Sequence, residues 1–272
     1  MERQLPSLTI HGTSFTVDIM KEALIEAENS NNIIPFKEML YKGDHYAFSY
    51  DLNEKNLPGI ISSAFEDVQV PAMVKLDPEG MALKYKKNID EIKEKTDFEI
   101  IIDQDLYKRR LSGHLPVIEI MNHPFYVDVR MDSLRPKDDF TTLGIRYSEI
   151  DDYIHPDDQC YWIPYHPASH TVKKIDPEKI TAIPKDVFLI EIPTLEKLDP
   201  VGYARHHGFD IEQIVMANLI EKNMVAKIID WKETGLQQII EKNLSKKQSK
   251  DVKNKIGNQP KKAIRRSRGN KM

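Results

Sequence analysis

Leu5–Ile19 reads LPSLTIHGTSFTVDI and Leu115–Val129 reads LPVIEIMNHPFYVDV, so the chain contains a closely similar stretch twice. Leu, Pro, Ile, Phe, Val and Asp recur in the same order without a gap, 110 positions apart. Apolar and polar residues alternate on either side of turn-forming residues, which are His11–Ser14 in the first copy and Asn122 with Pro124 in the second. This pattern predicts a β-hairpin in each copy.

A second pair of matching segments follows the hairpins. Val70–Ala82, VPAMVKLDPEGMA, corresponds to Ile192–Ala204, IPTLEKLDPVGYA, at an offset of 122 residues. In each block the aspartate, Asp77 or Asp199, suits a helix N-cap, and the proline after it suits the first helical position. The glycine in each block is expected to pack against a neighbouring backbone. Two matching blocks in the same order predict a tandem duplication of a domain-sized unit.

The predicted fold class is α+β, with an antiparallel sheet and short helices in each unit. Between the units, Phe98–Asp103 is expected to form a buried strand and Asp105–Ser112 a short helix, and a short helix is also expected within Lys21–Ala27. The predicted divisions are residues 5–93 (unit one), 94–114 (connecting strand and helix), 115–215 (unit two), 216–244 (a strand, Met224–Trp231, and an amphipathic helix, Lys232–Leu244) and 245–272 (a basic tail, disordered or partly helical when free).

Composition favours a soluble globular protein, because 40% of the 272 residues are apolar and 30% are charged. No stretch approaches the roughly 18–20 consecutive apolar residues that a membrane span needs, and the N-terminal sequence shows no signal peptide. A single cysteine, Cys160, excludes an internal disulfide framework. These features predict a cytoplasmic protein without a membrane partner.

The net charge of −4 conceals an asymmetry. From residue 246 onward there are eleven Lys and Arg and one acid, so this tail carries about +10 and the preceding body about −14. Such an arm binds DNA or RNA phosphates without sequence preference, although a solvated tail is an equally good interpretation. The densest candidate nucleic-acid-binding cluster is Lys261, Lys262, Arg265, Arg266 and Arg268.

Further motifs indicate a family resemblance. Besides the hairpin and the LDP blocks, these are Lys95–Glu99 (KTDFE), Met131–Phe140 (MDSLRPKDDF) and Ile183–Asp186 (IPKD). With them, residues 5–243 resemble an uncharacterised family of proteins from gut-type bacteria, some of which travel with mobile elements. The resemblance implies no catalytic residue and no cofactor, and it argues against a standard metabolic enzyme.

Polar residues of the second unit offer an alternative, catalytic interpretation. A loop there contains His155, Asp157, Asp158, Cys160, His166 and His170, but its spacing matches no recognised zinc site, so no metal is expected. The alternative catalytic residues are Asp128, His166, His170, His206 and His207. Because an aspartate stands at the same place in both hairpins, Asp128 is more simply a structural residue, and His206–His207 more simply an exposed helix end.

Three functions remain open from the sequence. The first is a non-catalytic binding or accessory protein whose body recognises a protein partner and whose tail contacts nucleic acid. The second is an enzyme with a His/Asp site in unit two or at the junction between units. The third is a homo-oligomeric structural protein.

Overall fold

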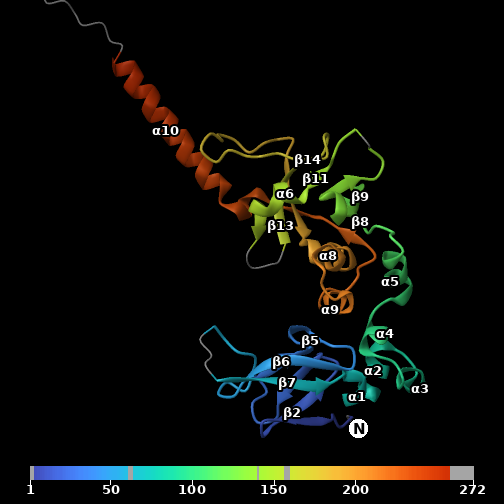
Figure 1. The fold of residues 1–272 in the computed structure, drawn as a ribbon. Coiled ribbons are helices and arrows are strands. Elements are labelled where there is room, and N and C mark those ends of the chain that lie inside the picture. The colour runs from blue at the N-terminus through green and yellow to red at the C-terminus, as the bar shows by residue number, and fades with distance from the viewer. Residues whose placement is uncertain (1–2, 61–63, 140, 156–159, 258–272) are drawn as a thin grey trace, which may run out of the picture.

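The computed structural model describes residues 3–60, 64–139, 141–155 and 160–257. It has an α+β fold of short helices and several sheets, in which the described strands pair antiparallel except for one parallel pair. Figure 1 shows the sheets of residues 5–93, here called the first segment, below those of residues 115–215, the second segment. The α+β class that the sequence predicts is therefore confirmed.

The N-terminal stretch forms the predicted hairpin. The two residues of its turn, His11 and Gly12, have left-handed φ values of 46° and 82°, as a two-residue hairpin turn requires. Two further strands extend the hairpin into a four-stranded antiparallel sheet, in which Phe15, Val17 and Leu24 are buried. Its strands are β1 (Ser7–Ile10), β2 (Thr13–Asp18), β3 (Ala23–Glu26) and β4 (Ile33–Pro35).

A three-stranded sheet and a run of short helices complete the first segment and the connection. The elements are η1 (Phe36–Glu38), β5 (Leu40–Tyr41), β6 (His45–Asp51), β7 (Phe65–Pro71), α1 (Met73–Leu76), α2 (Pro78–Tyr85), α3 (Ile89–Ile92), α4 (Asp97–Ile101) and α5 (Gln104–Leu111). Asp97 is fully buried, and its carboxylate accepts hydrogen bonds from the N–H groups of Met73 and Val74 at the start of α1.

The second segment has the same order of hairpin, second sheet and helices. Its elements are β8 (Val117–Ile120), β9 (His123–Asp128), η2 (Val129–Met131), β10 (Ser133–Pro136), β11 (Ile145–Arg146), α6 (Tyr147–Ile150), η3 (Asp151–Tyr153), β12 (Ile154–His155), β13 (Cys160–His166), β14 (Thr171–Val172), β15 (Phe188–Pro193), α7 (Leu195–Leu198), α8 (Pro200–His207) and α9 (Ile211–Ala217). The predicted strand Met224–Trp231 is two short strands, β16 (Met224–Val225), parallel to β8, and β17 (Lys227–Ile229), which pairs with β15.

Strand registers correspond between the two segments. Asp18 lies opposite Ala23 in the first segment, and Asp128 lies opposite Ser133 in the second. Each of these aspartates accepts a hydrogen bond from the backbone N–H three residues further on, at 3.2 and 3.1 Å. Both carboxylates therefore hold a local turn, which is the structural role that their positions predict.

Two predicted elements differ from the structure. Residues 21–27 contain strand β3 rather than a helix, because pairing with β2 and β4 on both sides outweighs the weak local helix preference. Phe98–Asp103 is not a strand, since α4 occupies Asp97–Ile101. Thr96 and Glu99 form a capping box at its start, a helix signal that the apolar run concealed.

The turn of the second hairpin also differs from the prediction. Met121 and Asn122 form it, with φ values of 49° and 63°, whereas Pro124 lies within β9 opposite Glu119. The turn is thus a two-residue turn like that of the first hairpin, with a methionine in a conformation that glycine usually adopts.

Helices α8 and α9 join the two segments. Val201 of α8 and Val215 of α9 are fully buried and belong to the apolar core of the first segment rather than the second. Figure 1 shows α9 descending from the upper sheets towards β5. The core of the first segment is therefore closed by helices that come from the second.

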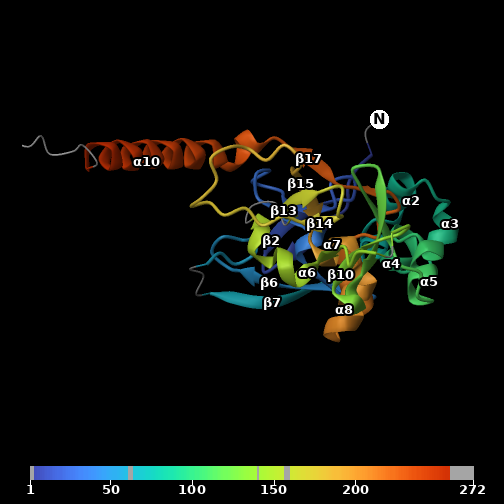
Figure 2. The same ribbon diagram turned by 90° about the horizontal axis from the view of Figure 1, so that it is seen from above.

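The last helix leaves the body of the protein. It is α10 (Leu236–Gly257), preceded by η4 (Trp231–Thr234), so the predicted helix begins four residues later and ends thirteen later than expected. Its start is docked, since Leu236, Ile240 and Asn243 are buried, whereas every side chain from residue 244 to residue 248 is exposed. Figures 1 and 2 show the rest of α10 extending away from the sheets.

Each LDP block caps a helix as predicted. The Asp77 carboxylate accepts a hydrogen bond from the Gly80 N–H at the start of α2, and the Asp199 carboxylate accepts one from the Gly202 N–H at the start of α8, both at 2.9 Å. A Cβ atom at either glycine would collide with the capping carboxylate itself. The glycines therefore make room for the cap, and the predicted packing against a neighbouring backbone is wrong.

An arginine from in front of each hairpin completes the cap. Arg3 donates two hydrogen bonds to Asp77, at 2.5 and 2.6 Å, and Arg110 donates two to Asp199, at 2.5 and 3.2 Å. The Arg110 side chain is only 7% exposed, against 29% for Arg3. The pair in the second segment is therefore a buried ion pair, and the pair in the first segment is partly hydrated.

We expect Asp199→Asn to lower the free energy of unfolding by about 3–5 kcal/mol, because it leaves the buried Arg110 without a counter-charge. Asparagine keeps the helix cap, so the loss reports the ion pair alone. Asp77→Asn is the matched control and should cost about 1 kcal/mol, since water reaches Arg3. Urea denaturation measures both, and equal losses would contradict this assignment.

Candidate functional site: an arginine-lined cleft

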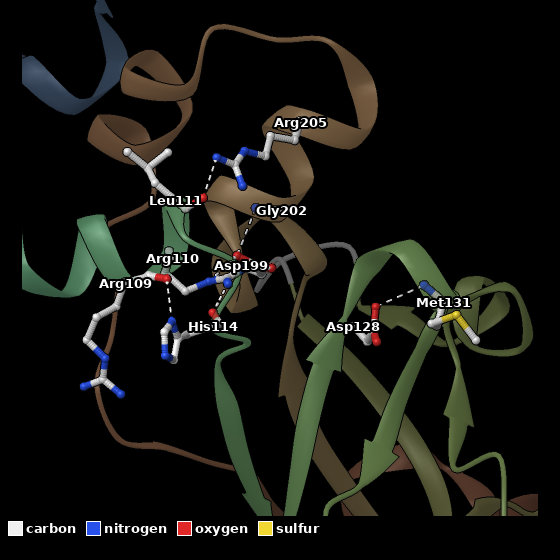
Figure 3. Close-up of polar contacts among 9 residues, drawn as sticks. All are labelled: Arg109, Arg110, Leu111, His114, Asp128, Met131, Asp199, Gly202 and Arg205. Carbon is white, nitrogen blue, oxygen red and sulfur yellow. Dashed lines mark hydrogen bonds and ion pairs between the residues drawn. The ribbon is translucent and has the colours of Figure 1, made fainter.

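A cleft of about 910 Å³ lies where the second hairpin meets α8 and the end of α5. Most of its polar wall is basic, and Asp128 is its acidic residue. Figure 3 shows the polar contacts of Arg110, Arg205 and Asp128, which are among the residues that line it. The basic residues that line it are Arg110, Arg130, Arg135, Arg205 and His206.

Two of these arginines are fully engaged within the protein. Arg110 binds Asp199 and also donates to the backbone carbonyl of His114. Arg135 donates to Asp128 at 2.9 and 3.2 Å. Both carboxylates have strong donors and a structural task, so neither is placed to serve as a general base.

The remaining basic groups carry charge that the body does not neutralise. The Arg130 side chain is exposed and forms no ion pair with the described residues. Arg205 is exposed as well, and one of its Nη2–H groups donates to the carbonyl of Leu111 at 3.0 Å. The ring of His206, also exposed, contacts His207 at 4.9 Å between ring centroids. The cleft therefore presents an excess of two positive charges when His206 is neutral.

The equivalent place in the first segment carries less unneutralised positive charge among the described residues. Met20 and Leu83 stand where the second segment has Arg130 and Arg205, and Lys84 stands where it has His206. Lys84 donates to the carbonyls of Ile19 and Met20, at 3.0 and 3.3 Å, and pairs with Glu22 at 2.6 Å. The corresponding turn is thus bridged by a neutralised lysine in one segment and left open and basic in the other.

The alternative catalytic residues do not all lie together. Asp128 and His206 line the arginine-lined cleft, but His166 and His170 belong to the β13–β14 turn. His166 contacts Ser169 Oγ at 2.8 Å and Asp186 at 3.3 Å. His207 packs against Tyr203 and Phe209 near the end of α8, as expected of an exposed helix end.

His170 is part of a small aromatic cluster. Its Nδ1 lies 2.8 Å from the Tyr165 hydroxyl, and its ring stacks on His123 with centroids 4.1 Å apart. The pKa of His170 is lowered, first by burial, which disfavours the imidazolium, and then by repulsion from His123, while Asp139 opposes both effects. This cluster stabilises the neutral histidine and packs the end of the second hairpin.

The described residues form no metal-binding group, and none of the alternative catalytic residues lies at the cavity between the segments. In the described ranges no group of three His, Cys, Asp or Glu side chains could hold a metal ion, and Asp157 and Asp158 lie outside those ranges. A cavity of about 230 Å³ at the junction is lined mainly by apolar side chains, among them Phe36, Met39 and Met216. None of the five alternative catalytic residues lines it.

The nucleic-acid-binding prediction falls on residues that the structure does not describe. Lys261, Lys262, Arg265, Arg266 and Arg268 all follow Gly257, the last described residue. Their assignment therefore stays a prediction.

The comparisons with known proteins place this chain in no group. No family model, no curated protein and no solved structure matches it. Among the described residues, no helix is both long and apolar enough to cross a membrane.

Sequence reasoning missed the arginines of the cleft. The two copies differ not only in their histidines but also where Met20 and Leu83 of the first correspond to Arg130 and Arg205 of the second. Aligning the copies residue by residue would have found them, because an exposed position that changes from apolar to arginine is not required by the shared fold.

We expect stability to fall as the pH drops below about 6.5, the usual pKa of histidine. Below this pH the unfolded chain takes up a proton at His170, whereas the folded chain, in which the pKa of His170 is lowered, does not. The contribution of His170 to stability is therefore present above pH 6.5 and lost as the pH falls through its pKa in the folded protein. Urea midpoints at pH 7.5 and 5.5 measure the effect. His170→Asn, which tolerates the left-handed φ of 55°, should reduce this pH dependence, and exposed His206→Asn should not.

Proposed function

We propose that this protein is a non-catalytic binding or accessory protein whose basic tail contacts nucleic acid and whose body recognises a protein partner. The observation that carries the proposal is the segregation of charge: about +10 after residue 245, against about −14 before it. Clustered lysine and arginine bind phosphates through counterion release, whatever the base sequence. DNA and RNA are both candidates for the tail.

The course of α10 supports this role for the tail. Asn243 fixes the docked part of the helix by donating to the carbonyls of Pro177 and Ile180, at 2.8 and 2.9 Å. Beyond it, α10 runs to Gly257 away from the sheets, so the basic residues that follow start at a distance from the acidic body. A ligand as large as a nucleic acid could reach a segment held in this way.

The polar core supports a non-catalytic protein. Asp77 and Asp199 cap helices, and Asp18 and Asp128 hold turns, so these conspicuous carboxylates are used by the fold. We also propose that the two segments arose by tandem duplication, which explains why the caps, the turns and the strand registers correspond. The single cysteine supports a cytoplasmic location.

The edge of the sheet that contains β12, β13, β15 and β17 supports a protein partner. β17 is its last strand, and Ile228 on that strand is 61% exposed. An edge strand with exposed apolar side chains suits the addition of a strand from another protein.

Truncation after Leu244 removes the basic arm but leaves the docked start of α10 intact. We expect binding to a labelled duplex, DNA or RNA, to weaken by about 100-fold or more at low salt, and the salt dependence to flatten. Alanine at Lys261, Lys262, Arg265, Arg266 and Arg268 in the full chain is the length-matched control and should reproduce most of the loss. Unchanged binding by the truncated protein in fluorescence anisotropy would refute the role of the tail.

Ile228→Lys should leave the fold intact, because the side chain is exposed, and should abolish co-purification of the partner from native cells. The charge opposes addition of a strand at this edge. Leu83→Lys, at an exposed site on α2, is the matched control and should not change the recovered partner. Equal recovery with all three proteins would exclude this edge as the interface.

A further inference from the structure

We infer that the arginine-lined cleft of the second segment binds phosphate groups of a nucleic-acid backbone, as a second contact on the body besides the tail. The observation is that Arg130 and Arg205 line one cleft of about 910 Å³ with no carboxylate to neutralise them among the described residues. This inference rests on the proposed nucleic-acid function, but the two can fail separately.

The paired arginines make the cleft a fixed structure. Arg110 is held by Asp199 and by the His114 carbonyl, and Arg135 is held by Asp128. The Arg110 bonds fix the end of α5 to the start of α8 (Figure 3), and the Arg135 bond fixes β10 to the end of β9. The unpaired arginines extend from elements that are already held in place, so little backbone ordering is required when an anion binds.

The fold itself does not account for the unpaired arginines. Their equivalents in the first segment are Met20, which is 56% exposed, and Leu83, which is 65% exposed, so these sites tolerate side chains without charge. Arg205 stands in the last turn of α8, where a cation also complements the helix dipole, whereas α2 has Leu83 at this position and its last-turn cation at Lys84. The helix therefore does not require its cation at the position of Arg205, and the dipole of α8 does not account for Arg130.

The chemistry of the cleft favours phosphate as the ligand. A guanidinium group presents several N–H donors in a plane that matches two phosphate oxygens. Four arginines line the cleft, together with the apolar side chains of Leu115 and Met131. A cleft of this size that opens to solvent suits part of a long polyanion.

The test measures binding of a labelled 20-base-pair DNA duplex, and of an RNA duplex, to the full chain carrying Arg130→Gln and Arg205→Gln. We expect about tenfold weaker binding, and a slope of log K against log salt that is smaller by about 2, since each lost phosphate contact removes about one unit. The matched control is Lys42→Gln with Lys87→Gln, two exposed lysines of the first segment, which should leave the slope nearly unchanged. Circular dichroism verifies that both variants fold.

The outcomes separate the inference from the proposed function. If the arginine variant binds as the control does while truncation after Leu244 abolishes binding, the cleft inference is wrong and the tail stands. If truncation has no effect but the arginine variant weakens binding, the cleft stands alone. Calorimetry with inorganic pyrophosphate forms the last arm: pyrophosphate binding that needs Arg130 and Arg205, together with unaffected duplex binding, would overturn a nucleic-acid ligand in favour of a small phosphate.

Discussion

The contact on which the structure depends most is the buried pair between Arg110 and Asp199, with its partly hydrated counterpart between Arg3 and Asp77. In each pair the aspartate carboxylate caps a helix, lies against a glycine that leaves room for it, and binds an arginine that precedes the first strand of the hairpin. Removing a carboxylate from water is costly unless its oxygens are all bonded, so each of these groups is needed by the others. The consequence is that the start of the hairpin and the start of the helix are fixed to each other.

A second constraint is the position of α8 and α9. Val201 and Val215 complete the core of the first segment, although their own helices belong to the second. The duplicated units that the sequence predicts are therefore not two independent cores joined by a linker. A defect at the Asp199 cap, at the start of α8, would therefore disturb both cores at once.

Features of the fold that depend on neighbouring residues could be predicted from the sequence, and features that depend on distant residues could not. The hairpins and the LDP caps are local, since alternation and a capping aspartate act within a few residues, and both were predicted correctly. The start of α4 was missed because an apolar run was weighted above the capping box of Thr96 and Glu99. The arginine partners of the caps could not be predicted, because Arg110 and Asp199 are 89 residues apart and nothing local distinguishes a buried arginine from an exposed one. The cleft could not be predicted for the same reason, since it forms where three distant pieces of chain meet.

The positions of cleft and tail have an electrostatic consequence. A body of about −14 repels a polyanion, but at 0.1 M salt the Debye length is about 10 Å, so the repulsion is local. The part of α10 from residue 244 to residue 257 spans about 20 Å at 1.5 Å per residue, so the five lysines from Lys246 to Lys255 lie progressively farther from the docked end. In the proposed function, the lysines nearest the end of α10 would therefore be the least screened by the acidic body. A nucleic acid brought closer would meet that body, and a favourable approach then needs a basic patch on it, which the unneutralised Arg130 and Arg205 supply.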